Sequence, residues 1–178
     1  MIKLKEFKKS DIEQLCSWVS NATPEFVMQW AGPSLEYPVT IERLNRYLID
    51  SSKSESYMYI FKALNENNNA IGHISLGKID HQKHSARIGR VLVGEKNARG
   101  NGYGEMMVNE VVKFGFKQLN LYSICLGVFD FNSSAIRCYE KCGFIKTEVL
   151  PEYRKVGREY WNLVEMRILK RDWEKIGG

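Results

Sequence analysis

"ARGNGYGEMM", residues 98–107, places one arginine and three alternating glycines directly before a long stretch with the apolar spacing of a helix. The first turn of a helix carries unpaired N–H groups and a partial positive charge, which together favour an anion. A tight turn would need only one glycine to supply a positive φ. The stretch therefore predicts a loop that lets a phosphate-bearing ligand approach the backbone closely.

The spacing of these glycines excludes two common phosphate-binding loops. The stretch reads GxGxG, whereas the dinucleotide-binding fingerprint reads GxGxxG and has an acidic residue about 20 positions further on. A Walker loop needs a GK[ST] sequence, which does not follow here. The loop is thus expected to bind phosphate in another class of protein.

The periodicity around the loop predicts one α/β (α+β) domain over residues 1–178. Strands are expected at 2–7, 57–63, 70–78, 85–94, 123–129, 144–149 and 160–169. Helices are expected at 11–19, capped by Ser10 with Glu13 completing a capping box, from Thr40 to 48, at 102–118 and at 132–142. Residues 20–40 read as loop with at most a helical turn. We expect a mixed, mostly antiparallel central sheet flanked by helices, with a β-α-β crossover around the glycine loop.

Composition and charge exclude several classes of function. The chain has 178 residues, 44% of them hydrophobic, and no apolar run long enough to cross a membrane. Its N-terminus has no apolar segment typical of a secretory signal, so a cytoplasmic location without membrane association is expected. The net charge is +5, but the basic residues are scattered among acidic ones, which argues against nucleic acid as a partner. The four cysteines lack metal-site spacing, so reduced thiols and no metal are expected.

Two segments resemble a known family. Residues 99–104, Arg-Gly-Asn-Gly-Tyr-Gly, match the [QR]xxGx[GA] pyrophosphate loop of the GNAT superfamily, the acetyl-CoA-dependent N-acetyltransferases. Residues 132–144, NSSAIRCYEKCGF, match the NxxAxxxYxxxGF segment of the same family. The order of predicted elements fits this family over nearly the whole chain. The segments 114–128 and 157–169 resemble the branch that contains ribosomal-protein-alanine and spermidine N-acetyltransferases.

The resemblance implies that acetyl-CoA is the co-substrate and indicates its binding residues. They are Leu92, Val93, Arg99, Gly100, Asn101, Gly102, Tyr103, Gly104 and Asn132. In the family, the strand that ends at Leu92 and Val93 splays from its neighbour and binds pantetheine, whereas composition alone reads both residues as strand core. Asn132 is also a good helix N-cap. Lys96, Arg137 and Lys141 either neutralise the adenosine 3′-phosphate or are solvated charges.

Tyr139 is the candidate catalytic residue. Acetyl transfer from a thioester to an amine needs donors for an oxyanion, a neutral amine and a proton for the departing sulfur. A phenol with a pKa near 10 is protonated at pH 7 and can hydrogen-bond or donate to a thiolate, whose pKa is about 8.5. The residue could instead be a core aromatic, because it shares a helix face with Ala135 and Gly143. The resemblance favours the catalytic role.

The sequence names no general base. Some relatives carry a glutamate five residues before the asparagine, where this chain has Gly127. Others carry one in the strand before the loop, where this chain offers Arg87 and Arg90. Asp130, Glu152 and a chain of water molecules remain open.

The acceptor pocket is expected between the N-terminal helices, the loop around Trp30 and the hairpin 151–160. Its candidate lining residues, each of which could equally be core, are Trp30, Tyr153, Tyr160 and Trp161. Glu25, Glu152 and Glu159 are either attractors for a cationic amine or surface charges.

The resulting functional prediction is an enzyme that moves an acetyl group from acetyl-CoA to a primary amine by direct attack in a ternary complex. The acceptor is either a protein N-terminus, such as that of a ribosomal protein, or a small amine such as a polyamine or aminoglycoside. A homodimer is compatible with the sequence. The alternative prediction is a non-catalytic acyl-CoA-binding sensor module, which the missing base keeps open.

Overall fold

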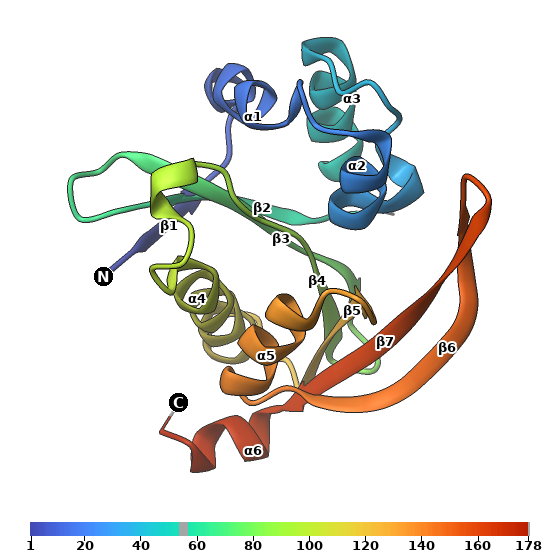
Figure 1. Cartoon of the computed structure of the whole chain (residues 1–178). Coiled ribbons are helices and arrows are strands. Elements are labelled where there is room, and N and C mark those ends of the chain that lie inside the picture. The colour runs from blue at the N-terminus through green and yellow to red at the C-terminus, as the bar shows by residue number, and fades with distance from the viewer. Residues whose placement is uncertain (54–56, 178) are drawn as a thin grey trace.

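The computed structural model describes residues 1–53 and 57–177 (Figure 1). Its strands are β1 (Lys3–Glu6), β2 (Tyr59–Leu64), β3 (Ala70–Asp80), β4 (Ser85–Val93), β5 (Ser123–Phe129), β6 (Ile145–Val156) and β7 (Glu159–Leu169). Its helices are α1 (Ile12–Val19), α2 (Pro24–Ala31), α3 (Ile41–Ser51), α4 (Tyr103–Lys117), α5 (Ser133–Lys141) and α6 (Lys170–Lys175). Short 3₁₀ turns occur at Lys9–Asp11, Gly32–Ser34 and Lys96–Ala98.

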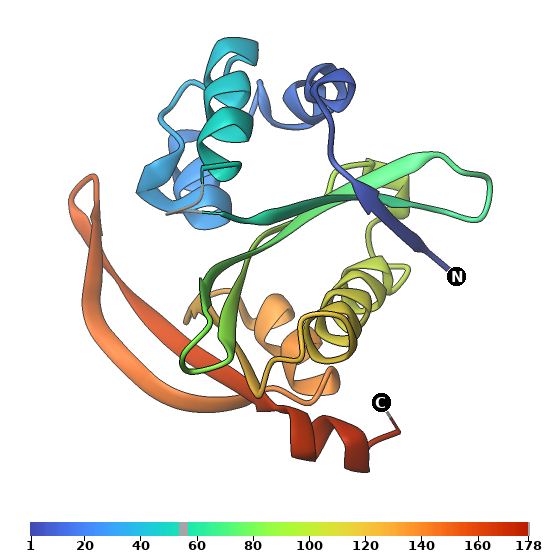
Figure 2. The same cartoon turned by 180° about the vertical axis from the view of Figure 1, so that it is seen from behind.

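The strands form one sheet in the order β1-β2-β3-β4-β5-β7-β6. Neighbouring strands are antiparallel except for β4 and β5, which are parallel and are joined by the crossover helix α4. Helices α1, α2 and α3 lie over one side of the sheet, and α4 and α5 lie on the other (Figures 1 and 2). The predicted mixed, mostly antiparallel sheet with its β-α-β crossover is confirmed.

The two parallel strands separate soon after they begin. β4 pairs with β5 only at Ser85–Arg87, opposite Ser123–Cys125. From Ile88 onward, β4 pairs only with β3. The carboxyl half of β4 therefore has an edge without a strand partner in the middle of the sheet, which is where ligands bind in many α/β folds.

A β-bulge in β4 changes which side chains face each side of the sheet. Between the pairs His73–Leu92 and Ser75–Gly89, β4 uses one residue more than β3. Ile88 packs in the core under α4, but Leu92, four positions later, packs under α1, α2 and α3. Regular alternation would place both on the same side, so the bulge accounts for the reversal. Arg90 lies in the bulge with a φ of 51°.

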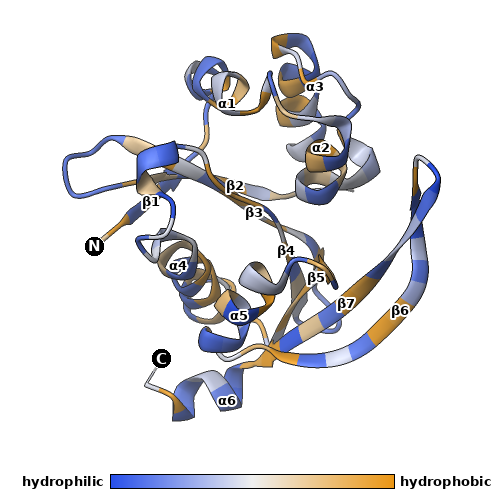
Figure 3. Ribbon diagram, in the orientation of Figure 1, coloured by the Kyte–Doolittle hydropathy of each residue, from blue (hydrophilic) through white to orange (hydrophobic). Residues whose placement is uncertain are grey.

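Two hydrophobic cores hold the helices to the sheet. One lies between the sheet and the amphipathic helix α4, where Met107, Val108, Val111, Val112 and Phe116 are buried. The second lies under the N-terminal helices, whose hydrophobic residues alternate with hydrophilic ones in Figure 3. β7 contributes Val164, Met166 and Ile168 to the first core, and the far end of the β6–β7 hairpin projects from the rest of the sheet (Figure 1).

Three local predictions were wrong. Ser10 does not cap α1, because it lies inside a 3₁₀ turn; the Asp11 carboxylate accepts from the Lys8 backbone N–H at 2.8 Å and from Lys62 Nζ at 2.6 Å. Residues 24–31 form helix α2 rather than loop: Pro24 begins it and the Thr23 hydroxyl accepts from the Phe26 N–H. The last two strands are longer than expected, with the turn at 157–158.

Within the described ranges, no helix is both long and apolar enough to cross a bilayer. No group of three or more His, Cys, Asp or Glu residues among them is arranged to hold a metal ion.

Candidate active site

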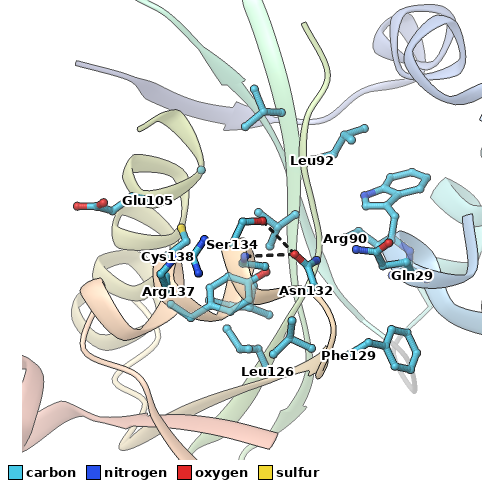
Figure 4. A pocket seen from close by; sticks show the side chains of 18 of the residues that line it. Gln29, Arg90, Leu92, Glu105, Leu126, Phe129, Asn132, Ser134, Arg137 and Cys138 are labelled. Carbon is cyan, nitrogen blue, oxygen red and sulfur yellow. Dashed lines mark hydrogen bonds between the residues drawn. The ribbon is translucent and has the colours of Figure 1, made fainter. Parts of the chain in front are cut away.

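A cleft of about 660 Å³ lies along the free edge of β4. Its walls are the carboxyl half of β4, the glycine loop, α5 and the end of β5, and α2 contributes Phe26 and Gln29 (Figure 4). The sequence-predicted residues that line it are Leu92, Val93, Arg99, Gly100, Gly102, Gly104, Asn132 and Tyr139. Two predicted residues do not: the Asn101 side chain donates to Asn97 O, and Tyr103 packs against the core.

The glycine loop leaves the start of α4 open. Gly100 and Gly102 have φ values of 80° and 77°, which favour glycine. Among the described residues no side chain caps α4, whereas side chains cap α2, α3 and α5. The first N–H groups of α4 are therefore left for an anion, which is the fit that a CoA pyrophosphate requires. Arg99 Nε donates to Val93 O at 3.0 Å and fixes this exposed side chain at the cleft mouth.

Asn132 begins α5 and points into the cleft. Its Oδ1 accepts from the Ala135 N–H at 3.2 Å and from Ser134 Oγ at 3.1 Å, as the dashed lines in Figure 4 show. The N-cap role is thus present, and the amide nitrogen stays available to a ligand. Arg137 and Lys141 of the same helix also line the cleft, whereas Lys96 does not.

Tyr139 lies on the α5 wall, packed near Phe144 with a ring-centroid distance of 6.3 Å. Burial, with smaller contributions from Cys138 and Cys142, raises the pKa of its hydroxyl well above the ordinary value. The phenol is therefore neutral at physiological pH and keeps its proton available for a hydrogen bond. Tyr139 packs against the core and also lines the cleft, and its catalytic role stays a prediction.

The place of the missing glutamate is filled from the neighbouring strands. A Cβ on Gly127 would clash with Arg87 Nη2. Arg87 donates to both carboxylate oxygens of Glu165, at 2.7 Å each. The two side chains are only 26% and 20% exposed. This ion pair takes the space that a side chain at position 127 would need.

The other candidate bases lie outside the cleft. Asp130 accepts from Asn162 Nδ2 at 2.8 Å, and the Glu152 N–H donates to Asn162 Oδ1 at 2.9 Å. Both residues are exposed and neither lines a cleft. Glu105 is the one carboxylate among the described lining residues, and it lies on α4, across the cleft from Arg90 (Figure 4).

A second cleft, of about 740 Å³, meets the first where β4 and β5 separate. Residues that line both are Gln29, Trp30, Ile88, Gly89, Arg90, Gly127 and Phe129. Trp30 and Tyr153 line the second cleft, as the sequence predicted, but Tyr160 and Trp161 do not. None of Glu25, Glu152 and Glu159 lines it either. Gln29 was not predicted as a lining residue, because its helix was not expected.

His73, on the neighbouring strand β3, contacts the bulge in β4. Its Nδ1 lies 3.1 Å from Arg90 O and its Nε2 lies 3.5 Å from Tyr47 Oη. The rings of Phe7, Trp30 and Tyr47 surround it, with centroid distances of 5.2, 5.9 and 6.0 Å. Burial lowers the pKa of this fully buried imidazole to about 4, so it is neutral at pH 7.

This lowered pKa predicts acid sensitivity. Unfolded His73 takes up a proton near its ordinary pKa of 6.5, which the folded chain resists down to about 4. The contribution of neutral His73 to the free energy of unfolding is therefore fully present above pH 6.5 and is lost as the pH falls toward 4. The free energy of unfolding should fall by about 2 kcal/mol between pH 7 and pH 5. Urea unfolding of the wild type and of His73→Leu at both pH values measures it. If both chains lose the same stability, the acid sensitivity has another source.

Comparisons with known proteins agree with this geometry. The family "Acetyltransferase (GNAT) domain" matches residues 2–145. Spermidine N(1)-acetyltransferase from Vibrio cholerae is 27% identical over 129 residues, 72% of this chain and 70% of that protein. The uncharacterized N-acetyltransferase p20 from Bacillus licheniformis is 25% identical over 173 residues, 97% of this chain and 94% of that protein.

The fold likeness extends over nearly the whole chain. A crystal structure of spermidine N-acetyltransferase from Vibrio cholerae, in complex with CoA and spermine, has a TM-score of 0.83 at 22% identity. It covers 97% of this chain and 98% of that chain. Together with the family match, this confirms the resemblance stated from the two motifs: the chain belongs to the GNAT acetyltransferase family and is an acetyl-CoA-dependent N-acetyltransferase.

Proposed function

We propose that this chain, acting as a single catalytic domain over residues 1–178, transfers acetyl from acetyl-CoA directly to a primary amine. The observation that carries the proposal is the junction of two clefts at the free edge of β4. One cleft ends at an uncapped helix N-terminus suited to pyrophosphate, and the other opens between α2 and the β6–β7 hairpin. Two substrates can therefore meet without a covalent enzyme intermediate.

The proposed cofactor contacts follow the first cleft. Backbone N–H groups from Gly100 to Gly104 bind the pyrophosphate, and Arg99 adds charge. Arg137 and Lys141 face the adenosine phosphate, while Leu92, Val93 and Asn132 line the path of pantetheine. Asn101 and Tyr103 contribute through backbone geometry, because their side chains are engaged elsewhere. No metal takes part in this scheme.

The chemistry needs one bond formed and one broken. The amine nitrogen attacks the acetyl carbonyl carbon, the C–S bond breaks, one proton leaves nitrogen and one reaches sulfur. Tyr139 donates a hydrogen bond to the departing sulfur. With no carboxylate inherited for the role of base, water removes the amine proton. The acceptor is a peptide N-terminus or a small amine; one named relative, from Vibrio cholerae, is a spermidine N(1)-acetyltransferase.

The test is a mass-spectrometric screen of the purified protein. Acetyl-CoA is supplied with peptides, polyamines, aminoglycosides and amino acids, and both acetylated product and free thiol are measured. We expect stoichiometric formation of the two. Tight binding of acetyl-CoA with no acetylated amine would instead support the acyl-CoA sensor.

Gly104→Val tests the phosphate site. A Cβ at this position would lie 3.8 Å from Cys138 Sγ, an ordinary contact, so the protein itself has room for it. Gly102 is a poorer choice because its φ is 77°, which strains a β-branched residue. We expect calorimetric affinity for acetyl-CoA to fall at least about tenfold, or 1.4 kcal/mol. Asn109→Val, on the exposed side of α4, is the control. Equal affinity for acetyl-CoA in both variants would mean that the phosphates bind at another place.

We also propose that the chain self-associates. The edge strand β6 exposes Ile145, Val149 and Tyr153, and one structural relative, spermidine N-acetyltransferase from Vibrio cholerae, is dodecameric. Light scattering at micromolar concentration should report at least a dimer. A monomer would contradict the proposal.

A further inference from the structure

The second cleft carries positive charge and no negative charge from the described residues. Lys78, Arg87, Arg90 and Arg154 line it, and no Asp or Glu of residues 1–53 and 57–177 does. The charge of Arg87 is compensated by Glu165. Lys78, Arg90 and Arg154 have no ion-pair partner among the described residues. A site for a polycation is expected to be acidic, so this wall fits a different substrate.

Arg90 brings this charge to the junction of the two clefts. The bulge changes the side of the sheet that the β4 side chains face, so the Arg90 guanidinium lies on the side of the N-terminal helices. The Arg90 Cζ atom lies 4.5 Å from the centroid of the Tyr47 ring. Burial raises the pKa of the Tyr47 hydroxyl to about 12, so this neighbour is uncharged. Figure 4 shows Arg90 beside Gln29, on the α2 side of the cleft. A positive φ at a non-glycine residue is the kind of strain that functional sites retain.

Hydrogen-bond donors exceed acceptors at this junction. Arg90 Nη2 donates to Ser34 Oγ at 2.7 Å, and Nη1 donates to the weak acceptor Met58 Sδ at 3.5 Å. Arg90 Nε and Trp30 Nε1 are buried without a partner in the described part of the chain. A protonated polyamine brings only further donors, whereas a carboxylate brings only acceptors.

We propose that the acceptor is a primary amine that also carries an anionic group, a carboxylate above all, and that Arg90 binds this group at the junction. The inference rests on the proposed acetyl transfer and specifies its substrate class. Trp30, Met58, Phe129 and Leu163 supply apolar wall for the body of such a molecule. Lys78 and Arg154 attract it from outside.

The decisive experiment needs no variant. kcat/KM is compared for ω-aminocarboxylates of two to six methylenes, their amides and the diamines of equal length, and for the dipeptide Ala-Phe against its amide. Within each set the reacting amine is similar and only the far group changes. We expect the best carboxylate to exceed its amide and its diamine at least about tenfold. Diamines or amides as good as every carboxylate would overturn the inference while leaving acetyl transfer intact. No acetylation of any amine would defeat the proposed function itself.

Arg90→Gln then tests the binding residue. We expect kcat/KM for the preferred carboxylate to fall at least about tenfold, with little change for its amide. Arg90→Lys should restore part of the preference, because lysine keeps the positive charge. The recovery should be incomplete, because lysine lacks the planar guanidinium that binds a carboxylate through two N–H groups. Arg46→Gln, which removes an exposed charge on α3 outside both clefts, should keep the wild-type preference. An equal loss for carboxylate and amide would assign Arg90 only to the structure of the bulge.

Discussion

Replacing Tyr139 with phenylalanine is expected to lower kcat by about 10²- to 10⁴-fold, the usual contribution of one acid–base or hydrogen-bonding group in the transition state. The ring still packs near Phe144, so the core under α5 keeps its shape. Only the hydroxyl is lost, and with it the proposed hydrogen bond to the departing sulfur. Affinity for acetyl-CoA should stay within a few-fold, because the glycine loop and Asn132 are unchanged.

The measurement is thiol release with the best acceptor from the screen, together with melting curves. Tyr122→Phe, which removes an exposed phenol outside both clefts, is the matched control. Because burial raises the Tyr139 pKa, the hydroxyl stays protonated and the wild-type rate should show no decline from this group below about pH 10. If Tyr139→Phe turned over at the wild-type rate, water or a backbone group would have to donate the hydrogen bond to the departing sulfur instead.

The sequence predicted the parts of the fold that depend on local pattern. The glycine loop, the Asn132 cap and the strand at Ser123–Phe129 rest on spacing within a few residues, and the structure has each of them where expected. Helix α2 was missed although its start is encoded by Thr23 and Pro24, because the prolines at positions 24, 33 and 38 in this segment favour turns. Because this helix was not predicted, Gln29 was not predicted as a lining residue either.

The arrangement of the second cleft depends on contacts between distant segments. The bulge that turns Arg90 toward the N-terminal helices is a register shift between β3 and β4, which no local pattern shows. The reason for glycine at position 127 lies in Arg87 and Glu165, which are 40 positions before it and 38 after it in the sequence. Such pairings are set by the tertiary fold, so they became visible only with the structure.

Arg87→Met is expected to destabilise the chain by about 3 kcal/mol, because it leaves the Glu165 carboxylate without its partner at a largely buried site. Replacing both, as Arg87→Met with Glu165→Leu, should recover most of that loss, since no charge then remains to be desolvated. The control is Arg46→Met, which breaks the exposed pair with Glu42 and should cost less than about 0.5 kcal/mol.

Urea unfolding of the two single variants and the double variant measures the coupling directly. A coupling of about 2 kcal/mol or more would show that the pair is a structural unit, which accounts for a glycine where relatives carry a base. Because Arg87 also lines the second cleft, where the acceptor is proposed to bind, the stable double variant has a second use. If its preference for carboxylate acceptors is unchanged, the charge that selects them belongs to Arg90 and not to Arg87. Additive single effects would instead mean that solvent screens the pair, and the glycine would need another explanation.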